Sequence, residues 1–255
     1  MSTPKLVFII PYRDREQQLA FFKRHMTYIL EDYNPNEYEI LILHQVDKKS
    51  FNRGAMKNIG FLVVKNKYPN TYHNITLVFN DVDTMPFTKG FFNYETRPKK
   101  IKHFYGYRHT LGGIVCINAR DFELINGFIN LYSWGYEDNN LNMRVLSAGL
   151  EIDRSVFYSI LDKNVIHLQD GTKRLVNKGE FDKYKMNIAD GASTIHNLNY
   201  SVVSDTEYEN IYMINVLQFS TLTEEDKSKT VEYDLQNGNT PFKGSRTPKM
   251  NMFFR

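Results

Sequence analysis

The sequence predicts an α/β fold with a mostly parallel central sheet flanked by helices. Three apolar, β-rich segments each end in polar residues, and a helical pattern separates each segment from the next within the first eighty residues. This strand, helix, strand, helix, strand order is typical of a doubly wound sheet. In such sheets ligands bind at the carboxyl ends of the parallel strands. We therefore expect a binding site at that edge.

The first half of the chain supplies the regular elements. The predicted strands and helices cover residues 5–10 (strand), 14–30 (helix), 38–45 (strand), 53–65 (helix) and 75–79 (strand). Asp14 is the expected N-cap of the first helix. Because the carboxyl ends of parallel strands meet at one edge, Pro11, the loop 45–53 and the segment 81–83 should lie close together.

The second half is less regular. We expect a strand over 111–117, a short helix over 119–125, an amphipathic helix after residue 140 and a short strand over 164–167. After residue 170 the chain becomes polar and rich in lysine, and its periodicity weakens. The prediction is one domain over 1–230, in halves 1–110 and 111–230, followed by a loosely attached tail over 231–255.

Composition narrows the class of protein. The formal charge is only +3 and the basic residues are spread along the chain, so no nucleic-acid partner is expected. A mildly positive cleft would suit a phosphate-bearing small molecule as ligand. Cys116 is the single cysteine, which excludes a disulfide within the chain and gives no reason for an oxidising compartment. The apolar run 6–10 is too short for a signal peptide or a membrane anchor. We expect a soluble cytoplasmic or other intracellular protein without a membrane span.

Two carboxylates end the third predicted strand. Asp81 and Asp83 are two residues apart, so they point to the same face. They repel each other unless a cation lies beside them, and a divalent cation with hard oxygen ligands is one solution. Capping of a turn is the alternative reading. His167 follows a short apolar strand and is either a metal ligand or a structural histidine.

A second polar segment surrounds the only tryptophan. Trp134 and Gly135 precede Glu137 and Asp138, which stand where a helix begins. Acids at that position complement the helix dipole, and this alone would explain why two acidic residues stand there. The functional reading is a mobile lid in which Gly135 permits movement, Trp134 stacks on a ligand and a carboxylate acts as general base toward a hydroxyl.

Taken in order, these motifs resemble the β-1,4-galactosyltransferase family. The six matching motifs, within roughly residues 6–200, are Phe8-Ile9-Ile10-Pro11-Tyr12-Arg13-Asp14-Arg15, Phe51-Asn52-Arg53, Asp81-Val82-Asp83, Gly112-Gly113, Asn126-Gly127-Phe128 with Trp134-Gly135-Tyr136-Glu137-Asp138-Asn139-Asn140, and His167. The resemblance implies a GT-A fold with a lid and a metal-dependent, inverting transfer. A hexose (galactose, glucose or N-acetylhexosamine) would pass from a UDP-sugar to a sugar hydroxyl of a glycan or glycoprotein. The implied cofactor is Mn²⁺, with Mg²⁺ as the alternative.

The resemblance also implies roles for the matching residues, with 1–110 as the donor half and 111–230 as the acceptor half. The implied donor-binding residues are Pro11, Tyr12, Arg13, Arg15, Phe51, Arg53, Asp81, Val82, Thr110, Gly112, Gly113 and Trp134. The implied acceptor-binding residues are Tyr136, Glu137, Asp138 and Phe181, with Asp138 as the catalytic base. The implied metal ligands are Asp83 and His167.

Some positions depart from the family pattern. Vertebrate galactose enzymes have Tyr-Phe where this chain has Thr110-Leu111, so space near the sugar 2-position makes UDP-GalNAc or another hexose credible as donor. Asn164 replaces a metal-binding Met, which leaves Asn164 or water as the third ligand. The family's Gly-Gly-Glu becomes Gly135-Tyr136-Glu137, and its Arg-Phe-Asp becomes Glu180-Phe181-Asp182. The rival function is a nucleotide-sugar or glycan-binding protein that has lost catalysis.

Overall fold

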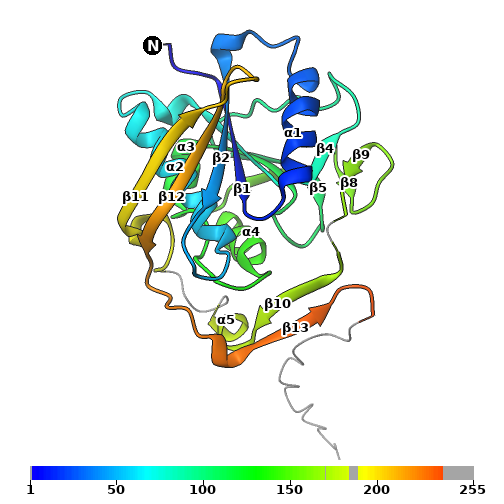
Figure 1. The fold of residues 1–255 in the computed structure, drawn as a ribbon. Helices are drawn as coiled ribbons and strands as arrows, with labels where there is room; N and C mark the ends of the chain where they lie inside the picture. Colours follow the sequence, from blue (N-terminus) through cyan, green and yellow to red (C-terminus); the bar gives the residue numbers. More distant parts are fainter. Residues whose placement is uncertain (1, 170, 184–188, 238–255) are drawn as a thin grey trace, which may run out of the picture.

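A computed structural model of the 255-residue chain describes residues 2–169, 171–183 and 189–237. Within these ranges a nine-stranded mixed sheet forms the centre of the protein (Figure 1). Its strands lie in the order β11 (His196–Ser204), β12 (Ile211–Ser220), β2 (Tyr38–Gln45), β1 (Leu6–Tyr12), β3 (Thr76–Asn80), β6 (Ile114–Asn118), β5 (Lys100–Gly106) and β7 (Glu151–Asp153), with β8 (Tyr158–Ser159) paired to β5. Strands β12, β2, β1 and β3 are parallel, and β6 is antiparallel to both neighbours.

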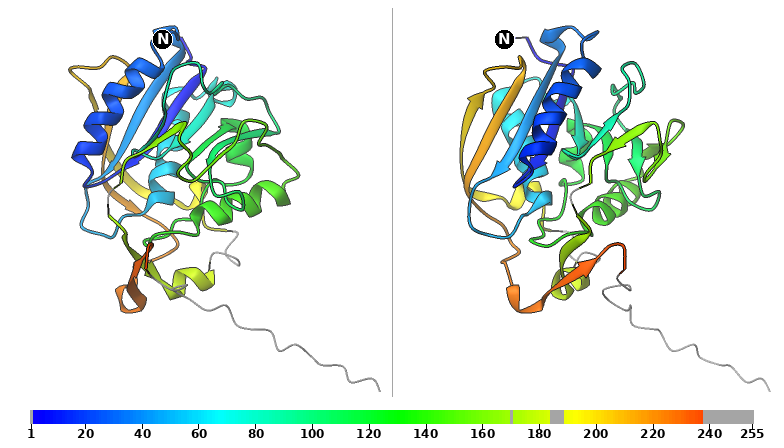
Figure 2. Two further views of the ribbon diagram at one scale, coloured as in Figure 1. Left: turned by 90° about the vertical axis from the view of Figure 1, so that its right-hand side faces the viewer. Right: turned by 45° about the vertical axis from the view of Figure 1, so that its right-hand side comes forward.

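The alternation of side chains along β1 divides the core into two layers. Leu6, Phe8 and Ile10 pack with helix α1 (Glu16–Ile29) on one face, whereas Val7 and Ile9 pack with helix α2 (Arg53–Lys67) on the other. Figure 2 shows the sheet between these layers. Because both faces are covered, β1 is buried along its whole length.

The rest of the described chain forms three further helices, two short strand pairs and four 3₁₀ turns. The other helices are α3 (Ala119–Leu124), α4 (Glu137–Ser147) and α5 (Lys178–Lys183). Strand β4 (Thr84–Pro86) pairs with β9 (Val165–His167), and β10 (Lys173–Asn177) pairs with β13 (Thr230–Asp234). Short 3₁₀ turns lie at Pro35–Glu37, Tyr72–Asn74, Ala192–Thr194 and Lys227–Lys229. In the described ranges, no helix combines the length and the apolar character that crossing a membrane requires.

The predicted α/β fold with its mostly parallel order is confirmed, with corrections at two element ends. The N-cap of α1 is Arg15 and not Asp14, whose φ of +51° lies in the left-handed region. Strand β6 begins at Ile114, three residues later than predicted, because Gly113 has a φ of +75° that a strand does not allow. The second predicted strand matches β2 at both ends.

The region after residue 170 is more ordered than its weak periodicity suggests. Strands β11 and β12 form an antiparallel pair, and β12 joins the sheet beside β2. The tail predicted over 231–255 starts inside β13, so its first residues are strand; residues 238–255 lie outside the described part. Division of the domain at residue 110 stays a prediction.

Gly54 lets the start of α2 lie against the chain that leads to α4. A methyl group there would be 2.0 Å from the carbonyl oxygen of Ile129. Gly54→Ala should therefore lower the free energy of unfolding by about 1–3 kcal/mol, although helix propensity alone predicts a gain of about 1 kcal/mol. Denaturant unfolding measures this change in the free energy of unfolding. Asn66→Ala, at an exposed position of the same helix, is the control and should stay within about 0.5 kcal/mol of the parent. A Gly54→Ala protein as stable as the parent would contradict this packing.

Candidate active site

A cleft of about 630 Å³ opens at the carboxyl ends of β1, β2 and β3. The predicted site residues that line it are Pro11, Arg13, Arg15, Phe51, Arg53, Asp81, Val82, Asp83, Thr110, Gly112, Gly113, Trp134, Tyr136, Glu137, Asp138 and His167. The structure thus brings together residues from both halves of the chain.

Two predicted residues lie outside the cleft wall. Tyr12 is 6% exposed and packs in the core beside His44, because it shares the α1 face of β1 with Ile10. A role of Tyr12 in donor binding stays a prediction. Phe181 does not line the cleft either, but its ring contacts that of Tyr136 edge to face at 4.8 Å. Phe181 therefore supports a residue of the cleft wall.

Pairing of β4 with β9 brings Asp83 and His167 next to each other. Thr84 pairs with His167, and the amide of Leu168 donates to the carbonyl of Asp83 at 2.8 Å. The Tyr105 hydroxyl lies 3.1 Å from Nδ1 of His167 and so orients the ring. A carboxylate and an imidazole together suit Mn²⁺.

A third protein ligand is not evident in the described part of the chain. No group of three His, Cys, Asp or Glu side chains there is arranged to hold a metal ion. Asn164, the alternative third ligand, does not line the cleft, and its side-chain amide donates to Asp162 at 2.9 Å. Of the two readings, this geometry favours water or ligand oxygens over Asn164.

Arg53 connects the two acidic segments of the cleft. Its guanidinium donates to Asp81 Oδ1 at 2.5 Å and lies 3.6 Å from Glu137 Oε1. Burial disfavours the charged guanidinium, but the carboxylates, Asp81 first, outweigh burial and raise the pKa of Arg53. Burial also acts on Asp81, yet Arg53 and Lys57 overcome it and lower the pKa of that carboxyl.

Glu137 is the acid with the least favourable surroundings. It is 2% exposed, and its Oε1 accepts no hydrogen bond. Burial, and then the charge of neighbouring Asp138, raise the pKa of Glu137 above its ordinary value. Buried polar atoms without a hydrogen bond are uncommon, and the guanidinium of Arg53, 3.6 Å away, is the charge that faces this oxygen.

Asp138 is held at two sides. The Lys57 ammonium donates to its Oδ1 at 2.8 Å. A methyl group at Gly112 would lie 2.1 Å from its Oδ2, so glycine is required where the carboxylate passes the backbone. The amide of Leu111 donates to the carbonyl of Asp138 at 3.0 Å. The Gly-Gly loop and the start of α4 therefore form one unit.

The segment before α4 has an unusual backbone. Gly135 has a φ of +95° and Tyr136 has a φ of +72°. For a non-glycine residue such as Tyr136, this left-handed backbone costs about 1–3 kcal/mol of conformational free energy. Glu180 accepts hydrogen bonds from the amides of Tyr132 and Ser133, each at 2.9 Å. The residue at the family's arginine position thus anchors the chain that leads to the predicted lid.

Arg13 binds the loop that follows β2. Its guanidinium donates to the carbonyls of Gln45, Asp47 and Lys49. This arrangement shapes the wall of the cleft before Phe51. Most of the hydrogen-bonding capacity of Arg13 is therefore used within the protein.

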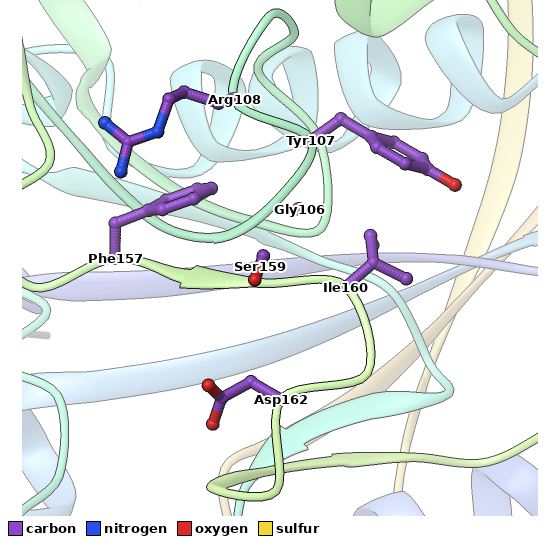
Figure 3. A pocket seen from close by; sticks show the side chains of 7 residues that line it. All are labelled: Gly106, Tyr107, Arg108, Phe157, Ser159, Ile160 and Asp162. Carbon is purple, nitrogen blue, oxygen red and sulfur yellow. The ribbon is translucent and has the colours of Figure 1, made fainter.

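A smaller pocket of about 460 Å³ adjoins the cleft (Figure 3). Gly106, Tyr107 and Ile160 line both cavities. In Figure 3 the Arg108 side chain lies over the ring of Phe157, 5.0 Å from its centroid, and Asp162 lies across the pocket. The cleft thus continues into a region with aromatic, cationic and anionic groups.

Some residues of the site are absent from the sequence-based prediction. The main ones are Lys57, Tyr105, Tyr107 and Arg174; Lys57 pairs with Asp138, and the others line the cleft. Lys57 carried little signal, because the polar Asn58 is buried beside it on the same helix. Arg174 carried none, since β10 is joined to the cleft by a contact between distant residues, in which the amide of Trp134 donates to the carbonyl of Leu175 at 2.8 Å.

Comparison with known proteins places the chain in a family. The model for the N-terminal region of glycosyl transferase group 7 matches residues 1–93, and the model for the N-terminal domain of galactosyltransferase matches residues 95–166. The Caenorhabditis elegans xylosylprotein 4-beta-galactosyltransferase is 29% identical over 84% of this chain and 78% of its own length. Drosophila melanogaster beta-1,4-galactosyltransferase 7 is 30% identical over 60% of this chain and 48% of its own length. The chain thus spans between half and four fifths of these relatives.

A solved structure supports the same family. The catalytic domain of Drosophila β1,4-galactosyltransferase 7, crystallised with xylobiose, superimposes with a TM-score of 0.69 at 23% identity, over 84% of this chain and 94% of that one. A mutant of the same fly enzyme, solved with manganese, UDP-Gal and xylobiose, gives a TM-score of 0.68. With its two matching family models and this shared fold, the chain belongs to glycosyltransferase group 7, the family of the β-1,4-galactosyltransferases, and has the GT-A fold.

Proposed function

We propose that this protein is a metal-dependent, inverting glycosyltransferase. It transfers a hexose from a UDP-sugar to a sugar hydroxyl of a glycan or glycoprotein. The observation that carries the proposal is that one cleft holds the pair Asp83 and His167 together with the acids Glu137 and Asp138. A metal, a nucleotide sugar and an acceptor would all need these groups, and a protein that only binds sugar would not.

Asp83 and His167 would hold the metal ion. They lie side by side through β4 and β9, and carboxylate and imidazole are ligands that Mn²⁺ accepts. Such an ion, when bound, offsets the negative charge that grows on the departing UDP. Arg53 and Arg15 also line the cleft and add positive charge for the diphosphate.

Asp138 is the proposed base. Inversion needs a single displacement, so one carboxylate that accepts the proton of the attacking hydroxyl is sufficient. Glu137 also lines the cleft, where its carboxylate would accept a hydrogen bond from another acceptor hydroxyl. Trp134 and the Gly135-Tyr136 segment would cover the donor and exclude water, which otherwise takes the sugar in place of the acceptor.

The names of the relatives guide the choice of substrates. A xylosylprotein galactosyltransferase and a fly enzyme solved with UDP-Gal and xylobiose make β-xylosides sensible first acceptors. The donor is left among the UDP-hexoses because Thr110 stands at a donor-side position where larger residues occur in vertebrate members. An intracellular location stays a prediction from composition.

UDP release tests the function directly. With Mn²⁺, a β-xyloside and a panel of UDP-Gal, UDP-Glc, UDP-GalNAc and UDP-GlcNAc, we expect release from at least one donor and an increase when acceptor is added. Asp138→Asn should lower kcat by about 10²–10⁴-fold, since it removes the base. Asp205→Asn, which alters an aspartate paired with Lys23 outside the cleft at 2.8 Å, is the control and should leave kcat unchanged. No release from any donor would favour a binding protein that has lost catalysis.

Metal dependence is measured separately. EDTA should abolish transfer and Mn²⁺ should restore it. Asp83→Ala and His167→Ala should each weaken Mn²⁺ binding by at least about tenfold in electron paramagnetic resonance titrations, because changes around metal ligands alone cost 10–100-fold. His73→Ala, on an exposed 3₁₀ turn, is the control. Full Mn²⁺ affinity in His167→Ala would refute the assignment.

Thr110 should control donor choice. Its side chain lines the cleft, and its hydroxyl donates to the carbonyl of Tyr107 at 3.2 Å. Thr110→Tyr fills the space beside the sugar 2-position, so the ratio of kcat/KM for UDP-Gal to that for UDP-GalNAc should rise by roughly tenfold or more. Thr110→Ser keeps the space and should keep the parent ratio. An unchanged ratio in Thr110→Tyr would show that residue 110 does not face the donor sugar.

A further inference from the structure

Lys57 is a buried lysine directed at the proposed base. It lies one turn after Arg53 on α2 and is 2% exposed. Its ammonium nitrogen is 2.8 Å from Asp138 Oδ1 and 4.4 Å from the ring centroid of Phe128. A buried ammonium is costly unless it is paired, and here the partner is a single carboxylate oxygen. The position of Lys57 is therefore defined by Asp138.

The same contact fixes the orientation of the Asp138 carboxylate. Oδ1 accepts from Lys57, while Oδ2 passes the backbone of Gly112, with no room for a side chain there. Asp138 and Gly112 both line the cleft, and the Asp138 side chain keeps 20% of its surface exposed. With one oxygen occupied by Lys57, Oδ2 is the oxygen that an acceptor hydroxyl can reach.

The charge of Lys57 also matters, because the base lies among other acids. Asp138 interacts electrostatically with Glu137 on its own helix and with Arg53 on α2, and Lys57 pairs with it directly. Arg53 already pairs with Asp81. Lys57 is thus the cation that compensates Asp138 beside the buried Glu137.

We propose that Lys57 is a positioning residue of the transfer reaction: it binds Oδ1 so that Oδ2 faces the acceptor. This inference rests on the proposed function. In the step, the acceptor oxygen forms a bond to the anomeric carbon and its proton passes to Oδ2. The bond from that carbon to the UDP oxygen breaks, and UDP leaves with the electron pair. Lys57 keeps its proton throughout.

Lys57→Met removes the charge and the hydrogen bond but keeps an unbranched, buried side chain. We expect kcat to fall by about 10²-fold, the lower end of what a general base contributes, with the KM for the donor nearly unchanged. A parent value of kcat in Lys57→Met would overturn the proposal.

Two further variants separate the contribution of the hydrogen bond from that of the charge and from a general effect on the helix. Lys57→Gln can still donate to Oδ1 without a charge, so it should recover part of kcat. Lys65→Met, at a position of α2 where the side chain is 43% exposed and pairs with Glu123 at 2.5 Å, should match the parent in kcat and KM. Equal losses in kcat for Lys57→Met and Lys65→Met would mean a purely structural effect and would overturn the proposal.

An independent measurement does not need activity. The ¹³C chemical shift of the Asp138 carboxyl can be followed by NMR, with its signal assigned by its loss in Asp138→Asn. It should change in Lys57→Met, which removes the hydrogen bond to Oδ1, and an unchanged chemical shift would overturn the proposal. If the parent releases no UDP from any donor, the proposed function fails, while this chemical shift still decides whether Lys57 binds Asp138.

Discussion

The cleft depends on a balance between crowded carboxylates and two cations of one helix. Asp81 ends one strand and Glu137 and Asp138 begin a helix far along the chain, yet all three line the same space. Arg53 and Lys57, on successive turns of α2, lie between them and form the ion pairs that make this proximity tolerable. The docking of α2 against the segment before α4 therefore decides whether the cleft can form.

The parts of the site that follow local rules could be predicted from the sequence. Asp81 and Asp83 come after a continuously apolar strand, and the sheet edge then determines where they lie. The period of two along β1 likewise places Tyr12 with the core residues Phe8 and Ile10, which is where the structure has it.

Other parts depend on contacts between distant segments, which no local pattern reveals. Asp83 lies beside His167 only because β4 and β9 pair. From the sequence, the two residues could be assigned to one metal site only through the order of the family motifs. Strand β12 was missed because its buried and exposed residues alternate irregularly, so neither a helical nor a strand period stands out. Its burial comes from neighbours on both sides, β2 and β11, and not from its own composition.

The place of β12 determines how the protein can be assembled during synthesis. Strand β2 has β1 on one side, but its other edge stays open until residues 211–220 have left the ribosome. An open edge rich in Ile and Leu is a template for pairing with other chains. A fragment that stops near residue 166, where the family models stop matching, would keep this edge exposed and should aggregate although its part of the cleft is present. Strand β12 thus covers an edge of the sheet that would otherwise be open to pairing with other chains.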